Sequence, residues 1–247
     1  MQSKYQMALA MMEMQTEIMA EKPKYYMDFL ECAANNYKYD YEEKLMIFAQ
    51  KPYATACASL ETWNKLGRWV NRGAKGIVLL DDRNPRYRLR YVFDVSDTNS
   101  RYGYEIHLWQ MQQNYEQSVI GAMENHFGEL TRTEYTEVAL LELSDHVVKD
   151  NLTDYFDHIE ALSPGIFDDE NVKNEVTNLV VNSVTYMVWK RCGYDTSKIF
   201  TEDIFENGIR YLNKQTLSAI RLYLTSTILT SSAKLHTGWL NAALCHG

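Results

Sequence analysis

Apolar residues near the start of the chain recur at helical spacing. In the segment 26–36, Met27, Leu30 and Ala34 fall on one helix face. The Met- and Ala-rich segment before it is also built from helix-forming residues, and Pro23 ends that helix or opens the next one. Two helices are therefore expected at the N-terminus.

Two further helices are predicted from the residues at which they would start. Asp40 precedes the segment 41–50, and Glu43 follows three residues later, which is the spacing of a capping box. Ser59 is the expected N-cap of a helix over residues 59–70.

Strand-like patterns replace helical spacing between residues 77 and 95. Ile77–Leu80 is a short aliphatic run, and residues 87–95 alternate in type, with Arg88 and Arg90 on one face. Asp81–Pro85 has the composition of a turn. The segment therefore predicts a β-hairpin with a basic second strand.

After the hairpin the pattern becomes helical. Residues 97–102 form an expected polar connection, and residues 104–110 are a third strand or the start of the next helix. Further helices are predicted at 119–127, 133–152, 172–192 and 216–233, with Gly193 ending the third. The predicted fold class is α+β: helices with a small antiparallel hairpin sheet, then an all-helical C-terminal region. The expected domains are residues 1–115 and an acidic helical domain at 116–247, with no Pro/Gly/Ser-rich linker between them.

A net charge of −8 by itself argues against binding to nucleic acid, but the charge is distributed unevenly along the chain. Residues 1–110 carry 15 basic and 14 acidic residues, whereas residues 111–247 carry 10 and 19. Within Leu60–Val92, 8 basic residues stand against 3 acidic ones. Because local potential steers a polyanion more than net charge does, this stretch is the candidate surface for nucleic acid.

The same stretch interleaves basic and aromatic residues. A groove for single-stranded nucleic acid needs cations that follow phosphates and aromatic faces on which bases stack. The candidate nucleic-acid-binding residues are Arg68, Trp69, Arg72, Lys75, Arg86, Tyr87, Arg88, Arg90 and Tyr91. The alternative is a solvated hairpin edge whose charges prevent edge-to-edge pairing.

Other residues of this stretch have structural explanations. Trp63 is expected to pack between helix and sheet, whereas Trp69 is expected to be exposed. Gly67, Gly73 and Gly76 provide backbone N–H groups for cradling phosphate, although tight turns are their more common use.

Metal, disulfide and membrane sites have little support in the sequence. The 4 cysteines are far apart and form no CxxC pair, so neither zinc nor a disulfide framework is predicted, and Cys192 is interpreted as a buried helix-end thiol. Asp154, Asp157 and His158 have ligand-like spacing, but a solvated acidic helix explains them more simply. No cofactor is expected.

Scattered thiols and the absence of a signal peptide or a run of about 18 apolar residues favour the cytoplasm over a membrane.

A family resemblance lies in the segment from Leu45 to Leu80, LMIFAQKPYATACASLETWNKLGRWVNRGAKGIVLL. It resembles the N-terminal domain of ArdC-type antirestriction proteins, which also begins large polyvalent proteins of mobile elements. The matching positions are Gln50, Pro52, Thr55, Trp63, Gly67, Val70, Gly73, Gly76 and Ile77. Tyr91–Thr98 resembles the second hairpin strand of that family. The resemblance covers about a third of the chain and implies an α+β module that binds single-stranded DNA.

The C-terminal half resembles other proteins less specifically. Asn174–Phe205 is similar to the helical region that follows this domain in multi-domain proteins of clostridial-type conjugative elements. ArdC-type proteins carry a metallopeptidase-like domain with HExxH, and none of the 6 histidines here begins that motif. Without its ligands and base, zinc hydrolysis is not implied, and the resemblance suggests that the helical half is a degenerate relative of the metallopeptidase-like domain.

Two functions of different classes are expected from these observations. The first is a counter-defence, antirestriction-like protein of a mobile genetic element that binds single-stranded DNA in the cytoplasm without catalysis. The second is an anti-CRISPR-like inhibitor that binds a host defence nuclease, a Cas or restriction protein, through an acidic or hairpin surface. An acidic surface that mimics DNA can occupy the positive channel of a nuclease. A scaffolding fragment of a larger polyvalent protein is a third interpretation.

Overall fold

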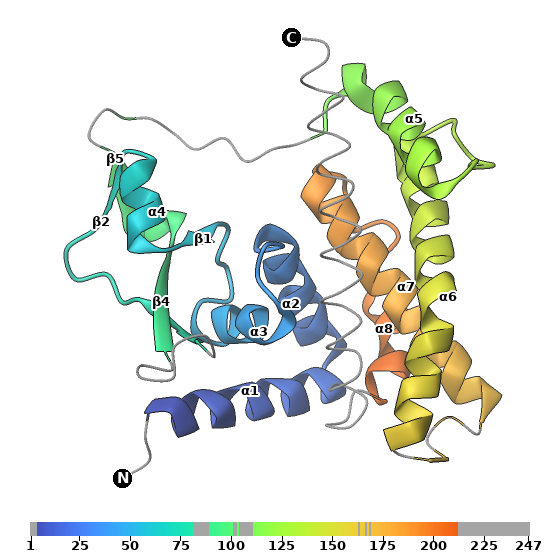
Figure 1. Cartoon of the computed structure of the whole chain (residues 1–247), viewed down its shortest axis with the longest axis horizontal. Helices are drawn as coiled ribbons and strands as arrows, with labels where there is room; N and C mark the ends of the chain where they lie inside the picture. Colours follow the sequence, from blue (N-terminus) through green and yellow to red (C-terminus); the bar gives the residue numbers. More distant parts are fainter. Residues whose placement is uncertain are drawn as a thin grey trace.

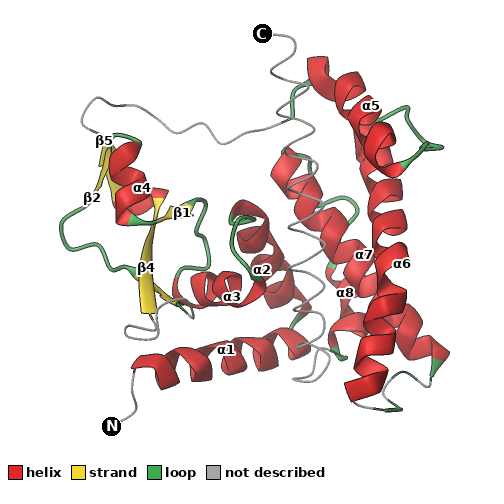
Figure 2. Cartoon of the chain, viewed as in Figure 1, coloured by secondary structure: helices red, strands yellow, loops and turns green. Residues whose placement is uncertain are grey.

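The chain folds as an α+β protein with its strands on one side and its longest helices on the other. A computed structural model describes residues 4–81, 89–100, 103, 111–162, 164–165, 167 and 169–211. The helices are α1 (Lys4–Glu21), α2 (Pro23–Asn35), α3 (Tyr41–Gln50), α4 (Leu60–Lys65), α5 (Glu116–Phe127), α6 (Thr136–Leu162), α7 (Glu170–Cys192) and α8 (Glu202–Ile209). The strands are β1 (Cys57–Ala58), β2 (Arg68–Val70), β3 (Ile77–Leu80), β4 (Leu89–Asp94) and β5 (Thr98–Ser100), with 3-10 turns at Val95–Asp97 and Gln113–Tyr115. Helices α2 and α3 lie between the strands and α5–α7 (Figures 1 and 2).

The predicted start and stop signals set the helix boundaries. The Asp40 carboxylate accepts a 2.8 Å hydrogen bond from the Glu43 N–H, and Glu43 accepts one from the Asp40 N–H, so the capping box is present. Ser59 caps α4 by accepting from the Thr62 N–H at 3.2 Å. Gly193, at φ 84°, ends α7 in the left-handed conformation. The predicted helices at 119–127 and 172–192 are confirmed as α5 and α7, and the helix predicted at 133–152 is present as α6 but continues ten residues further, to Leu162.

The helix predicted over residues 59–70 is wrong in its second half. Helix α4 ends at Lys65, because Gly67 adopts φ 70° and turns the chain out of the helix. Residues Arg68–Val70 then form β2, which pairs antiparallel with β5 inside the expected polar connection. The segments 82–88, 104–110 and 216–233 lie outside the described residues, so the predicted turn, third strand and last helix are not addressed there.

The main sheet has β4 at its centre, between β1 and β3, and all pairs are antiparallel. The β3–β4 pairing confirms the predicted hairpin, with Ile77 opposite Val92 and Leu80 opposite Leu89. Ile77 and Val92 are buried toward the helices, as is Leu79. This inner face fixes the register, because a shift by one residue would expose these side chains.

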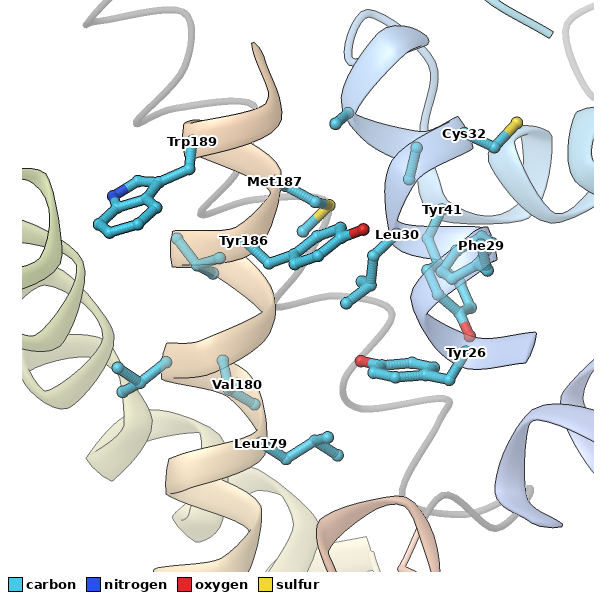
Figure 3. Close-up of a cluster of buried hydrophobic side chains, with 14 of the residues drawn as sticks. Tyr26, Phe29, Leu30, Cys32, Tyr41, Leu179, Val180, Tyr186, Met187 and Trp189 are labelled. Carbon is cyan, nitrogen blue, oxygen red and sulfur yellow. The ribbon is translucent and has the colours of Figure 1, made fainter. Parts of the chain in front are cut away.

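One hydrophobic core joins the two halves of the chain. The Tyr26 hydroxyl of α2 and the Ser183 hydroxyl of α7 share a buried 2.8 Å hydrogen bond, and the Tyr26 ring packs edge-on against Phe205 of α8. Figure 3 shows the aromatic and aliphatic side chains of α2 facing those of α7. The acidic helices are therefore packed against the N-terminal module.

A glycine on α8 allows this helix to pack closely against α7. A Cβ at Gly208 would lie 2.6 Å from Leu179 Cβ and 3.1 Å from the Glu175 carbonyl oxygen. We expect Gly208→Ala to lower the free energy of unfolding by about 1–3 kcal/mol, because the two helices must separate. Gly121→Ala is the control, since nothing lies within 4 Å there, and alanine should stabilise α5 by up to about 1 kcal/mol. Equal effects of both substitutions in urea unfolding would contradict this packing.

Candidate nucleic-acid interface

The turn between β2 and β3 presents two of the predicted cations to solvent. The Asn71 N–H donates to the Asp97 carbonyl at 2.8 Å, and the Ala74 N–H donates to the Asn71 carbonyl at 3.0 Å. Gly73 takes φ 87°, a conformation that glycine adopts at little cost. Arg72 and Lys75 are exposed on this hydrogen-bonded turn. The arrangement suits contacts with phosphates.

Trp69 is exposed, as predicted. It is the middle residue of β2, opposite Asn99, and strand alternation turns its side chain away from the half-buried Arg68 and Val70. Its exposed fraction is 46%, which leaves a large part of the indole open to a stacking base. Trp63, in contrast, is 3% exposed and donates from its Nε1 to the Phe93 carbonyl at 2.8 Å. The predicted packing of Trp63 between helix and sheet is confirmed.

Tyr91 provides a second exposed aromatic ring on β4. Alternation along β4 buries Val92 and Asp94 and leaves Tyr91 46% exposed. Gly76, the residue after Lys75, lies against Tyr91 and Phe93, and a Cβ there would meet atoms of both rings at 3.2 Å. Glycine at position 76 therefore lets the backbone lie close to the two rings, which a larger residue would have to displace slightly.

Two of the predicted cations are engaged within the protein. Arg68 donates from Nε to the Thr98 hydroxyl at 2.8 Å and from Nη2 to the Thr98 carbonyl at 3.2 Å, which ties β2 to β5. Arg90 forms an ion pair with Glu43 and lies 5.7 Å from the centre of the Tyr39 ring. These contacts give both residues a structural role that the sequence did not indicate. Arg86, Tyr87 and Arg88 lie outside the described residues.

Gln50 protects the edge of the sheet beside this surface. Its side-chain amide donates to the Val78 carbonyl and accepts from the Val78 N–H, both at 2.9 Å, as a neighbouring strand would. In the sequence, Gln50 is a matching position of the family pattern, and this pattern does not indicate its role at the sheet edge. A polar residue directly after the apolar residues of α3 is the local feature that could have indicated this role at the sheet edge.

Asp94 is a buried carboxylate of β4 that accepts several hydrogen bonds, a role that could not be expected from its place in the sequence. It is 1% exposed, and its carboxylate accepts from the Thr55 N–H at 2.7 Å, the Ala56 N–H at 2.9 Å and the Ser96 N–H at 3.0 Å. The Ser96 hydroxyl also donates to it at 2.6 Å. Burial raises the pKa of Asp94, but the hydrogen bonds from Ser96, Ala56 and Thr55 lower it by more. The carboxylate is therefore held in its charged form.

The alternative sites considered in the sequence gain no support. The left-handed conformations of Gly67 and Gly73 and the packing of Gly76 explain these glycines without phosphate. In the described part of the chain, no three His, Cys, Asp or Glu residues are grouped to hold a metal ion. Cys192 is buried at the end of α7, as predicted. None of the described helices is long and apolar enough to cross a membrane.

Comparisons with protein-family models, with curated proteins and with solved structures gave no match. The family resemblance therefore stays a prediction from the residues. Two exposed aromatic rings and two exposed cations lie on and beside the turn between β2 and β3. We call this set, Trp69, Arg72, Lys75 and Tyr91, the turn surface.

Proposed function

We propose that this chain binds single-stranded DNA through the turn surface, as a non-catalytic counter-defence protein of a mobile element in the cytoplasm. The observation that carries the proposal is that two exposed cations lie on one turn and two exposed aromatic rings lie on strands beside it. Arg72 follows Trp69 of β2 by three residues, and Lys75 precedes Gly76, which lies against Tyr91 of β4. The resemblance to the ArdC N-terminal domain supports the same partner.

Single strands fit this surface better than duplexes do. A base can stack on Trp69 or Tyr91 only if its face is accessible, and bases in a duplex are covered by their neighbours. Stacking contributes about 1–3 kcal/mol per base and depends little on sequence. The two cations add an attraction to the backbone that weakens with salt. The proposed partner is therefore a single strand bound without strong sequence preference.

Substitutions on the turn surface test this proposal. We expect Arg72→Glu with Lys75→Glu to weaken binding of a labelled oligonucleotide at least tenfold in fluorescence anisotropy, because charge reversal repels phosphates. Trp69→Ala should weaken it by about tenfold through lost stacking. Arg90 is unsuitable for this test, since its substitution also breaks the ion pair with Glu43.

A control with the same change in net charge separates local from global electrostatics. Lys22 and Lys198 are exposed and lie outside the turn surface, so Lys22→Glu with Lys198→Glu should change affinity less than threefold. Equal loss in both double variants would show that only net charge matters, and would contradict the turn surface as the site.

A second candidate function rests on the charge of α6. This helix carries seven acidic residues and one lysine, and Asp150, Asp154 and Asp157 are exposed at spacings that place them on one stripe. Such a stripe suits an inhibitor that occupies the positive channel of a nuclease. Changing all three residues to Asn should leave the affinity for DNA unchanged or higher. If the second function holds, the same change should abolish co-purification with a defence protein from a lysate treated with nuclease.

A further inference from the structure

Helix α1 carries an apolar stripe beside the one that it buries. Met7, Met11, Met14 and Ile18 recur at intervals of four, three and four residues, which places them on one helix face at the spacing of a helix–helix seam. Met7 is 58% and Met14 55% exposed, whereas Met11 and Ile18 are half-buried. We call these four residues the α1 stripe. The described residues leave more than half of the surface of Met7 and Met14 uncovered.

The neighbouring face of α1 holds the helix on the rest of the protein. Ala8, Gln15 and Met19 are buried, and each follows a residue of the α1 stripe directly. One residue corresponds to a rotation of about 100° around a helix. Helix α1 contacts α3 and β3, and the Tyr25 hydroxyl of α2 donates a hydrogen bond to the Gln15 side chain. The α1 stripe is therefore held to one side of this packed face and is accessible to a further helix.

The charge at the edge of the α1 stripe is negative. Glu17 and Glu21 follow Met14 and Ile18 by three residues, so they border the stripe, and both are exposed. Residues 212–247, beyond the described part of the chain, have the opposite charge. They contain no Asp or Glu, in a chain with a net charge of −8, and their basic residues are Lys214, Arg221 and Lys234. The last segment is therefore complementary in charge to α1.

The apolar pattern and length of the last segment also fit the α1 stripe. Within the helix predicted at 216–233, Leu217, Ile220, Leu224 and Ile228 recur at intervals of three, four and four residues, which places them on one face. A helix of these 18 residues would be about 27 Å long, and α1 also has 18 residues. The two apolar faces therefore match in length as well as in spacing.

The last described residues place the start of this segment near one end of α1. Helix α8 contacts α1, and Tyr211, two residues after the end of α8, packs against the hydrophobic core. Figure 1 shows α8 beside the end of α1 that leads into α2. A chain that continues from this end along α1 runs antiparallel to it. Lys214 would then lie near Glu21, at the point of entry.

We propose that the segment 216–233 docks as an amphipathic helix on the α1 stripe, antiparallel to α1. Its apolar face covers Met7 and Met14, while Lys214 and Arg221 lie near Glu21 and Glu17. The contact joins the last segment of the chain to the first helix. It does not involve the turn surface and is independent of the proposed function.

Hydrogen exchange of the full chain, followed by mass spectrometry, tests the docking. Backbone amides of 216–233 should exchange at least about tenfold more slowly than in an unstructured peptide of the same sequence. Met7→Ser with Met14→Ser removes apolar surface from the stripe without changing the charge, and should remove this protection. The amides of α3 should keep their protection in this variant, which shows that the rest of the fold is intact.

A matched control changes the opposite face of the same helix. Gln6 and Ala10 are exposed on α1 outside the stripe, so Gln6→Ser with Ala10→Ser should change the exchange of 216–233 by less than about twofold. Unprotected amides at 216–233 in the wild type would overturn the proposal, and so would protection that survives the loss of both methionines. Protection that depends on protein concentration, together with a dimer in light scattering, would assign the stripe to a second copy and would also overturn it.

Charge reversal tests which surface the segment occupies. Lys214→Glu with Arg221→Glu should speed exchange of 216–233 at least about tenfold, because like charges then face each other on the two helices. Adding Glu17→Lys with Glu21→Lys to the same chain should restore exchange to within about threefold of the wild type. A loss that these lysines do not restore would place the segment elsewhere and contradict docking on α1.

Discussion

Asp94→Ala is expected to lower the free energy of unfolding by about 3–5 kcal/mol, a large fraction of the stability of a typical domain. The carboxylate receives three backbone N–H bonds and one hydroxyl bond while it is almost fully buried. Alanine would leave these donors buried without an acceptor, which costs more than the lost bonds alone. Urea unfolding followed by circular dichroism measures the change.

Asp94→Asn separates the charge from the shape of this side chain. The amide keeps one acceptor oxygen, so we expect a smaller loss of about 2 kcal/mol. Asp97→Asn is the control, because Asp97 is more exposed and pairs with Lys51 at 2.7 Å near the surface; it should lose less than about 1 kcal/mol. A loss at Asp97 as large as that at Asp94 would contradict the central role of Asp94.

The pH dependence of stability should carry the signature of Asp94. Its pKa in the folded state lies below the ordinary value, so the folded protein binds a proton there less readily than the unfolded chain does. The stabilisation is complete above the unfolded-state pKa and is lost as pH falls through the folded-state pKa. The stability difference between wild type and Asp94→Asn should therefore shrink in acid.

Lys44→Met is expected to raise the free energy of unfolding by about 2–3 kcal/mol at pH 7. Lys44 is 3% exposed, and no carboxylate lies within ion-pair distance of its ammonium among the described residues. Burial lowers the pKa of Lys44 from 10.5 to about 8, an effect that Asp40 and Glu43 only partly offset. Methionine has a similar shape and no charge to desolvate. Lys22→Met, at an exposed lysine, should change stability by less than about 0.5 kcal/mol.

The benefit of Lys44→Met should disappear in alkali. The unfolded chain carries a charged Lys44 up to its ordinary pKa, whereas the folded protein releases that proton near pH 8. The penalty on the wild type is therefore complete below about pH 8 and is relieved as pH rises toward 10.5. Urea unfolding at pH 7 and pH 10 measures this difference. An equal gain at both values would contradict a buried ammonium as its cause.

Features coded by neighbouring residues could be predicted from the sequence. The Asp40–Glu43 capping box and the Gly193 helix end depend only on nearby side chains and on the conformational freedom of glycine. The hairpin was expected from the aliphatic run at 77–80 and the alternation of residues 87–95, and β3 and β4 pair as its two strands. The same local reasoning extended the fourth helix to residue 70, because the partner that makes β2 a strand lies about thirty residues later.

Features that depend on distant partners could not be predicted. Arg90 looked like a free cation, but Glu43, 47 residues earlier, binds it. Asp94 looked like one acid in a strand, yet its acceptor role arises only when the backbone at Thr55 and Ala56 folds beside it. Of the candidate site, the exposure of Trp69 and Tyr91 and the accessible Arg72 and Lys75 agree with the sequence interpretation.

The most direct test of the proposed function is a salt titration of wild-type binding to a labelled single strand and to the matching duplex. With two cations of the turn surface on phosphates, the logarithm of the binding constant should fall against the logarithm of salt concentration with a slope of about −1.4 or steeper for the single strand. The single strand should also bind more tightly than the duplex at every salt concentration, because only its bases can stack on Trp69 and Tyr91. Undetectable binding at micromolar protein and low salt, or tighter binding of the duplex, would contradict the proposed function.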